Sequence, residues 1–130
     1  MELDRLARLA VDCGFRLHKE IGPGLLESVY EVLLAMELTE RGLAVRRQVS
    51  VPIRHKGVVI DNAFKADLLI EDRLLIELKS VARNAPVHGK QVLTYLRLMG
   101  LPLGLLMNFG MGTFKDGLRR IVNNFEEPLR

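Results

Sequence analysis

Two acidic residues and one lysine stand inside short apolar runs of this chain, where charged side chains are unusual. Asp67 lies in the run 64–70, and Glu77 and Lys79 lie in the run 74–80. A carboxylate in such a run is costly to bury unless it is paired, hydrogen-bonded or bound to a metal, so its presence indicates a site. Two acids and a lysine in this order are a set of groups able to cleave a phosphodiester.

The three residues can act together only if two strands pair in one particular register. Glu77 and Lys79 are two residues apart, so on a strand they share a face. Pairing Asp67 with Glu77 leaves the three-residue loop 71–73, a common hairpin length. A shorter two-residue turn would pair Asp67 with Leu78 and move Glu77 to the opposite face. We therefore predict the three-residue loop.

In that register the two carboxylates suit a hard cation such as Mg²⁺, which takes oxygen ligands and keeps several waters; Mn²⁺ is a second candidate. The ion would also offset the repulsion between the two negative charges. Lys79 would steady an attacking water or the developing charge, so that phosphodiester hydrolysis fits best. The spacing alone leaves an alternative open: Glu77 and Lys79 exposed on an open sheet face, with Asp67 in a surface ion pair.

Hydrophobic periodicity predicts the elements that would position these side chains. Steps of three and four residues indicate helices, alternation indicates a half-exposed strand, and Lys56-Gly57 is a turn signal. Gly22-Pro23-Gly24 is a corner between the first two helices. In chain order we predict a helix at 3–21, a helix from about 25 to 42, strands at 43–60, 63–70 and 74–81, a helix at 87–99, a buried strand at 103–109, and an edge strand or short helix at 118–125.

Length and composition predict one soluble domain over residues 1–130. The chain is 48% hydrophobic and 27% charged, with a formal net charge of +3, which permits a nucleic-acid partner without requiring one. Cys13 is the single cysteine, which excludes an internal disulfide and favours a reducing cytoplasm. The amphipathic N-terminal pattern lacks the long apolar core of a signal peptide or membrane span.

Several motifs occur in a specific order. Gly24-x-x-Glu27-x-x-Tyr30 is followed by Asp67, by Glu77-x-Lys79 and by Gln91-x-x-x-Tyr95. In this combination the chain resembles the GxxExxY proteins of bacteria and archaea, which are part of the PD-(D/E)XK nuclease superfamily. The resemblance spans roughly residues 15–125. One departure is Ala66 in place of the proline of the superfamily's name, and that proline ligates nothing.

The resemblance implies an α/β (α+β) fold, with a mixed central sheet of about four or five strands flanked by helices and a restriction-endonuclease-like core. It implies Glu27 as a third metal ligand, beside Asp67 and Glu77. It also implies that Gln91 and Tyr95 lie beside the metal site and help to hold the substrate or a catalytic residue. Taken by residue type alone, Glu27 fits a solvated helical acid equally well, and Tyr95 fits a core position with Gln91 exposed.

Two further residues near the signature are candidates for contact with substrate or with groups around the metal. His18 precedes the glycine corner and could reach a phosphate, although a lone histidine is more often structural. Tyr30 lies one helical turn from Glu27 and shares its face.

We therefore expect a cytoplasmic, Mg²⁺-dependent nuclease that acts on nucleic acid, with DNA favoured over RNA, with a homodimer as a candidate assembly and no membrane partner. Two alternatives remain: a catalytically silent module that binds nucleic acid or protein, and a nucleotide-binding protein on the same fold.

Overall fold

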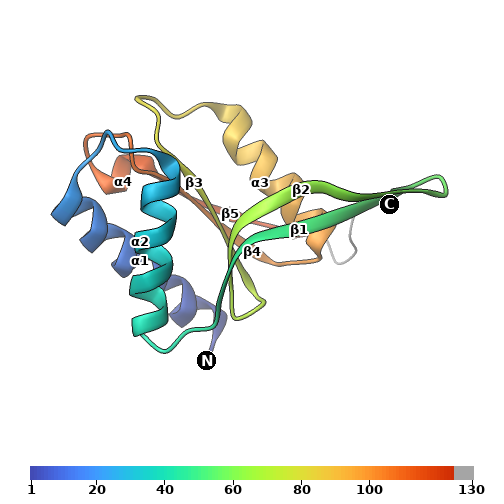
Figure 1. Cartoon of the computed structure of the whole chain (residues 1–130), viewed down its shortest axis with the longest axis horizontal. Helices are drawn as coiled ribbons and strands as arrows, with labels where there is room; N and C mark the ends of the chain where they lie inside the picture. The colour runs from blue at the N-terminus through green and yellow to red at the C-terminus, as the bar shows by residue number, and fades with distance from the viewer. Residues whose placement is uncertain (125–130) are drawn as a thin grey trace.

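A mixed five-stranded sheet with helices on both faces forms the body of the protein in a computed structural model that describes residues 1–124 (Figure 1). This is the predicted α+β class. The elements in chain order are α1 (Leu3–Ile21), α2 (Glu27–Glu40), β1 (Val45–His55), β2 (Val58–Ile70), β3 (Leu74–Lys79), α3 (Pro86–Met99), β4 (Leu103–Asn108), α4 (Phe114–Gly117) and β5 (Leu118–Val122).

The strands lie in the sheet in chain order, from β1 to β5. All neighbours are antiparallel except β3 and β4, which run parallel. A parallel connection needs a crossover, and α3 supplies it. Every residue of β4 is buried, as its uninterrupted apolar run predicts for a strand inside the sheet.

Two separate apolar clusters hold helices to the two faces of the sheet. On one face, the buried stripe of α1 and the inner side of α2 pack over residues of β2, β3 and β4, among them Leu68, Ile76 and Met107. On the other face, α3 packs over a smaller cluster that includes Ala66 and Leu75. The first two helices therefore form one layer. Among residues 1–124, no helix combines the length and apolar character needed to cross a membrane.

The hairpin between β2 and β3 has the predicted register. Leu68 pairs with Ile76, and Ile70 pairs with Leu74, which leaves the three-residue loop 71–73. This offset sets Asp67 opposite Glu77. The two strands pair over only these few residues and then separate.

The hairpin between β1 and β2 is much longer and runs past the body of the molecule (Figure 1). It closes at Lys56 and Gly57, whose φ angles are 49° and 80°, as a tight hairpin turn requires. The sequence prediction placed the start of β2 at residue 63 and extended the first strand to residue 60. Both boundaries were wrong, because β1 ends at His55 and β2 begins at Val58 directly after the turn.

Residues 118–125 were predicted to form either an edge strand or a short helix, and the described part of this segment forms an edge strand. The single-turn helix α4 leads into β5, which pairs with β4 from Met107↔Leu118 to Leu103↔Val122. Phe125, the last residue of the predicted element, lies outside the described residues. At the other end of the chain, Gly22 ends α1 with φ 82°, as expected for a corner between helices.

Candidate active site

Asp67 and Glu77 face each other where β2 and β3 separate. The Asp67 backbone N–H donates to Glu77 Oε2 at 2.9 Å, and the Leu78 backbone N–H donates to Asp67 Oδ2 at 2.9 Å. Side-chain oxygens thus take the place of the carbonyls that would continue the strand ladder. The predicted pairing of the two carboxylates follows directly from the register.

Burial changes the acidity of this pair. Glu77 is only 5% exposed. Its pKa is raised from 4.5 to about 9, first by burial, then by a hydrogen bond and the negative charge of Asp67, while the charge of Lys79 acts in the opposite direction. At neutral pH the pair therefore retains a proton unless a cation compensates the second negative charge. That requirement fits a hard divalent ion.

The described residues offer such an ion two carboxylates. Within residues 1–124, no group of three or more His, Cys, Asp or Glu side chains is placed to hold one metal jointly. Mg²⁺ usually binds through one or two carboxylates and keeps several waters, so Asp67 and Glu77 match its preference.

Lys79 and Glu27 lie close enough to the pair to influence it electrostatically. The charge of Lys79 acts to lower the pKa of Glu77 and that of Glu27. The net pKa of Glu27 is nevertheless raised, by partial burial and by the charges of Asp67 and Glu31. Glu27 is the first residue of α2 and borders a cavity of about 650 Å³ whose wall also includes Ser80. The structure thus places Glu27 beside the pair but not in one ligand group with it.

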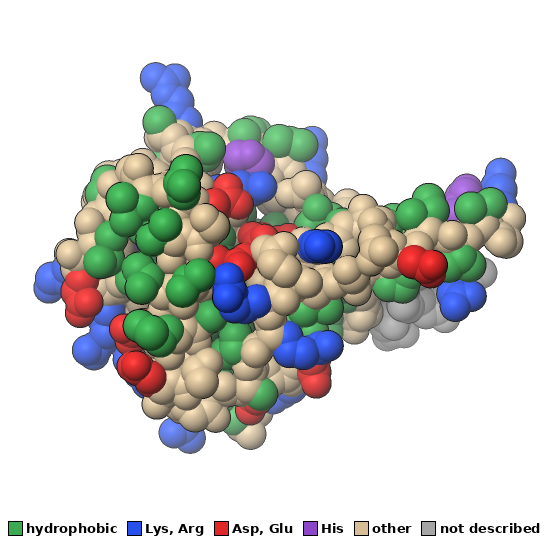
Figure 2. Space-filling model, viewed as in Figure 1, with side chains coloured by type: hydrophobic (Ala, Val, Ile, Leu, Met, Phe, Trp, Pro, Cys, Tyr) green, Lys and Arg blue, Asp and Glu red, His purple; other side chains and the backbone are tan. Residues whose placement is uncertain are grey.

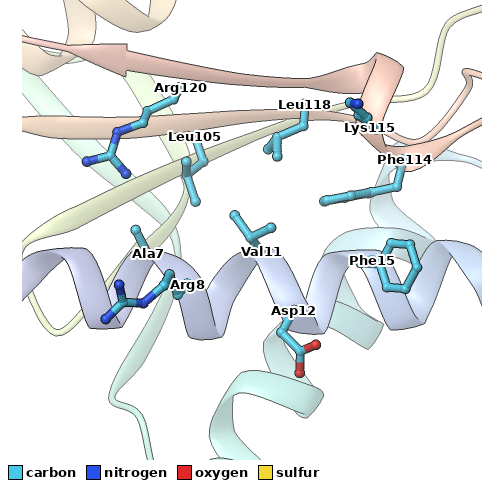
Figure 3. Close-up of a pocket in the computed structure, with 10 residues that line it drawn as sticks. All are labelled: Ala7, Arg8, Val11, Asp12, Phe15, Leu105, Phe114, Lys115, Leu118 and Arg120. Atoms are coloured by element: carbon cyan, nitrogen blue, oxygen red, sulfur yellow. The ribbon is translucent and has the colours of Figure 1, made fainter.

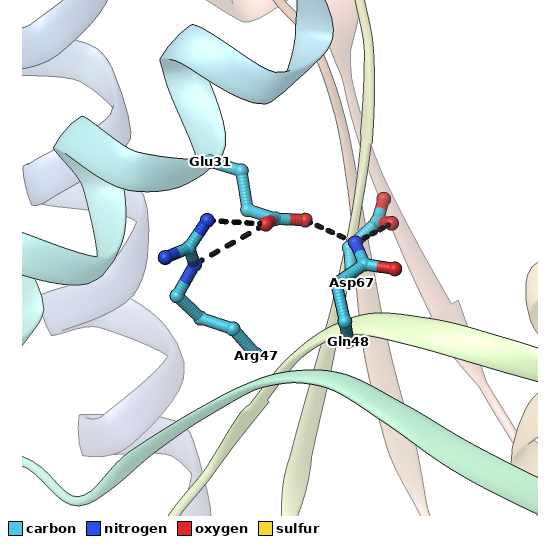
Figure 4. Close-up of polar contacts among 4 residues, drawn as sticks. All are labelled: Glu31, Arg47, Gln48 and Asp67. Carbon is cyan, nitrogen blue, oxygen red and sulfur yellow. Dashed lines mark hydrogen bonds and ion pairs between the residues drawn. The ribbon is translucent and has the colours of Figure 1, made fainter.

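A second acid of α2, Glu31, connects to Asp67 through a hydrogen-bonded network (Figure 4). Glu31 is 6% exposed, and its Oε2 accepts from Arg47 Nε at 3.2 Å and Nη2 at 3.0 Å. The side-chain amide of Gln48 donates to Glu31 Oε1 and, at 3.2 Å, to Asp67 Oδ1. The network joins α2, β1 and β2 and holds Oδ1 of Asp67, while Oδ2 accepts from Leu78.

Gln48 has an unusual backbone at this point, with φ of 50°. It stands opposite Asp67, between the ladder pairs Arg47↔Leu68 and Val49↔Ala66. Leu68 packs in the cluster under α1 and α2, whereas Ala66 packs in the cluster under α3. Residues two apart on a regular strand share a face, so the strands reverse their faces here. A left-handed, non-glycine residue of this kind costs energy and is typical of functional sites.

Sequence reasoning did not select Glu31, Arg47 or Gln48 for the site. The available signal was the position of Glu31, four residues after Glu27 and on the same helical face. Nothing in the strand pattern indicated that Gln48 would adopt a positive φ.

The two predicted residues of α3 differ in the contacts that they make. Tyr95 stacks on Phe64 with ring centroids 3.8 Å apart and an interplanar angle of 8°. Its pKa is raised by burial and by the charges of Glu77 and Asp67, so its hydroxyl lies near the pair. Gln91 lies one turn earlier, exposed to solvent and without a side-chain hydrogen bond to the described residues.

His18 and Tyr30 are engaged in the core instead. His18 Nε2 lies 2.9 Å from the carbonyl oxygen of Met111. Tyr30 is fully buried, stacks on Phe109 at 4.5 Å, and donates its hydroxyl to the carbonyl of Gly22 at 2.6 Å. These contacts fix the corner between α1 and α2, so the tyrosine of the Gly-x-x-Glu-x-x-Tyr motif positions the start of the helix that carries Glu27.

A separate apolar cavity of about 460 Å³ lies between α1 and the segment around β4, α4 and β5 (Figure 3). Val11, Phe15, Leu105 and Phe114 are among its lining residues. None of the predicted site residues lines it, and it contains no paired acids, so the candidate chemistry lies at the β2–β3 separation.

Residues 4–121 match the family model of the PD-(D/E)XK nuclease superfamily. The match covers most of the chain, and the chain therefore belongs to this superfamily. No curated protein and no solved structure matched the sequence.

Proposed function

We propose that this protein is a metal-dependent nuclease that hydrolyses phosphodiester bonds of DNA. The observation that carries the proposal is the buried Asp67–Glu77 pair at the β2–β3 separation, within a chain of a nuclease superfamily. RNA is the second candidate substrate.

Each side chain has a proposed role in the reaction. Asp67 and Glu77 would hold a divalent ion, Mg²⁺ or Mn²⁺, and Glu27 would approach from the start of α2 to join them as a further ligand when the ion binds. When bound, such an ion polarises a phosphoryl oxygen and acidifies a bound water. Lys79 orients the attacking water or stabilises the charge that develops on the phosphate. The Tyr95 hydroxyl and the Gln91 amide assist on the substrate side.

A nucleic-acid-binding module without catalysis is the alternative function. One observation favours it: burial and Asp67 raise the pKa of Glu77 to about 9, so the pair can keep a proton and remain buried without an ion. The two functions differ in whether wild-type protein cuts nucleic acid when a divalent ion is supplied.

The test is cleavage of double-stranded DNA, single-stranded DNA and RNA by purified protein, with Mg²⁺, with Mn²⁺ or with a chelator. Asp67→Asn and Glu77→Gln remove one charge while keeping side-chain shape, and Lys79→Met removes the ammonium. Each is expected to lower the cleavage rate by about 100-fold or more, the scale typical of losing an electrostatic catalytic group. Glu20→Gln, on the exposed side of α1, is the matched control and should leave the rate unchanged.

Cleavage that persists in all three variants, or in the presence of chelator, would overturn the proposed mechanism. Wild-type protein that binds nucleic acid but cuts none of the substrates would instead support the silent module. Hydrolysis of free nucleotides alone would identify a nucleotide-hydrolysing protein.

A further inference from the structure

The outer part of the β1–β2 hairpin, residues 49–66, is an arm that extends beyond the sheet (Figure 1). It begins beside Asp67, where β2 loses its pairing with β3. Its base packs on α3 through the stack of Phe64 on Tyr95. Beyond that contact, and among residues 1–124, the two strands pair only with each other. An isolated two-stranded ribbon is marginally stable in water, so an extended one suggests a partner surface.

The charged side chains of the arm are suited to an anionic partner. Arg54, Lys56 and Lys65 make no side-chain ion pair or hydrogen bond with the residues that the structure describes. Asp61 is the one acid between residues 49 and 66. By contrast Arg47, just before the arm, is engaged by Glu31. The arm therefore presents three uncommitted cations along its length.

The end of the arm also exposes β-branched side chains. His55 pairs with Val58 and Ile53 pairs with Ile60, and these four residues share one face. Val58 is 60% exposed and Ile60 is 54% exposed. Figure 2 shows basic, histidine and hydrophobic side chains together at the far end of the arm, and acidic side chains where the arm leaves the body.

We propose that the arm lies in the major groove of double-stranded DNA and directs one strand toward the Asp67–Glu77 pair. The major groove of B-form DNA admits a two-stranded ribbon, whereas that of A-form RNA is too deep and narrow for side chains to read. Arg54, Lys56 and Lys65 would neutralise phosphates, and the apolar face would contact thymine methyl groups. This inference rests on the proposed nuclease function and names the form of its substrate.

The length of the arm predicts how many base pairs of duplex it can contact. Val58 and Asp67 are nine positions apart in the sequence, which is about 30 Å at roughly 3.3 Å per residue. That length corresponds to about nine base pairs at about 3.4 Å each. A duplex must therefore extend roughly nine base pairs on one side of the cut to occupy the whole arm.

The first test measures binding without cleavage. A fluorescent 24-base-pair DNA duplex is titrated with protein in chelator, between 50 and 200 mM salt, and followed by anisotropy. The double variant Arg54→Ala/Lys56→Ala should bind about tenfold or more weakly, with a slope of log K against log salt smaller by about two. The control Arg5→Ala/Lys19→Ala removes the same charge from α1 and should change neither quantity appreciably.

The second test shortens the arm. Replacing residues 52–63 with Asn-Gly closes the ribbon on the pair Val51↔Phe64 and preserves the Phe64–Tyr95 stack. This variant should keep a thermal midpoint close to that of the wild type. It should bind duplex DNA weakly, and its cleavage should show a raised KM with kcat within a few-fold of the wild type.

The outcomes separate this inference from the proposed function. Duplex binding that depends on the arm, without cleavage under any metal condition, would support the proposed DNA contact of the arm and refute the proposed nuclease function. Cleavage by the wild type together with unimpaired binding by both arm variants would refute the proposed DNA contact of the arm and leave the proposed nuclease function standing. Absence of duplex binding by the wild type, or equally arm-dependent binding of single strands or duplex RNA, would overturn the groove assignment.

Discussion

Asp67 makes three hydrogen bonds to its two neighbouring strands, two to β3 and one to β1. Its backbone N–H donates to Glu77 Oε2, its Oδ2 accepts from the backbone of Leu78, and its Oδ1 accepts from Gln48. The carboxylate is therefore oriented by the protein itself, as a preorganised site requires. The least regular of these partners is Gln48, because its contact depends on a left-handed backbone conformation.

We predict that Gln48 positions Asp67 for cleavage. Gln48→Asn tolerates positive φ better than most residues but is one methylene too short to bridge Glu31 and Asp67. Its kcat should fall about tenfold with little change in KM, because about 1.4 kcal/mol of transition-state stabilisation is lost when the carboxylate is no longer positioned. Steady-state cleavage kinetics measure both quantities.

The control for this prediction is Gln48→Gly, which accommodates the backbone conformation fully and also removes the amide. If either variant cleaves at the wild-type rate, Gln48 has only a structural role. A thermal midpoint unchanged by Gln48→Gly alongside reduced kcat would exclude misfolding as the cause.

The contrast between Glu77 and Gln48 indicates what could be predicted at the scale of residues. Asp67, Glu77 and Lys79 were identifiable because acids in apolar runs are rare and a period of two fixes their face. Gln48 was not, because its role arises from a local reversal of the strand faces that has no sequence signature. Glu31 was not selected either, because nothing in the helical pattern showed that it would be buried and hydrogen-bonded to Arg47 and Gln48.

At the scale of elements, α3 supports both the arm and the carboxylate pair through Tyr95. Its ring stacks on Phe64 of β2, and its hydroxyl is affected by the charges of Asp67 and Glu77. One side chain therefore combines a packing role with a position beside the candidate chemistry. Substitutions that remove the ring and the hydroxyl separately can distinguish the two.

We predict that Tyr95→Phe retains stability and loses activity. Removing only the hydroxyl should leave the thermal midpoint nearly unchanged because the stack remains. Cleavage should fall about tenfold if the hydroxyl assists on the substrate side. Tyr95→Leu should in addition destabilise the fold by about 1–3 kcal/mol, because the aromatic stack is lost. Thermal denaturation and cleavage rate are measured on the same preparations, and full activity in Tyr95→Phe would limit Tyr95 to packing.

Elements with a buried face were predictable, and the exposed arm was not. The first helix was placed at its observed bounds because its apolar stripe is continuous from Leu6 to Leu17. The buried strand β4 was recognised because it is apolar on both faces. The first residues of β2, Val58–Val59–Ile60–Asp61–Asn62, are exposed and lack alternation, so the pattern did not show that a second strand begins at Val58, and residues 58–60 were assigned to the first strand.

At the scale of the whole molecule, the candidate site exists because strands β2 and β3 separate after a short paired segment. Two helices cover one face and one covers the other, and β2 leaves β3 between these layers. A charged pair can be buried there because the separating strands leave backbone N–H groups for the carboxylates to accept. The arm also starts where β2 and β3 separate. The candidate catalytic pair and the proposed DNA-binding arm are therefore adjacent in the fold.

The buried acid should also make the stability of the whole metal-free protein depend on pH. Glu77 has a pKa of about 9 when folded, against 4.5 for an unperturbed glutamate. Between these values the folded state keeps a proton that the unfolded state has lost, so stability falls as pH rises. The contribution is fully present below pH 4.5 and is lost as pH rises through about 9.

In chelator, the thermal midpoint of the wild type should therefore decrease by several degrees between pH 5.5 and pH 9 relative to Glu77→Gln, which cannot ionise there. Millimolar Mg²⁺ should restore much of the wild-type midpoint at high pH, because the ion binds the ionised pair and only the folded state presents it. Glu20→Gln should follow the wild type throughout. Identical pH profiles for the wild type and Glu77→Gln would mean that the Glu77 carboxyl is not held in its protonated form by the fold, and Mg²⁺ would then have no proton to displace.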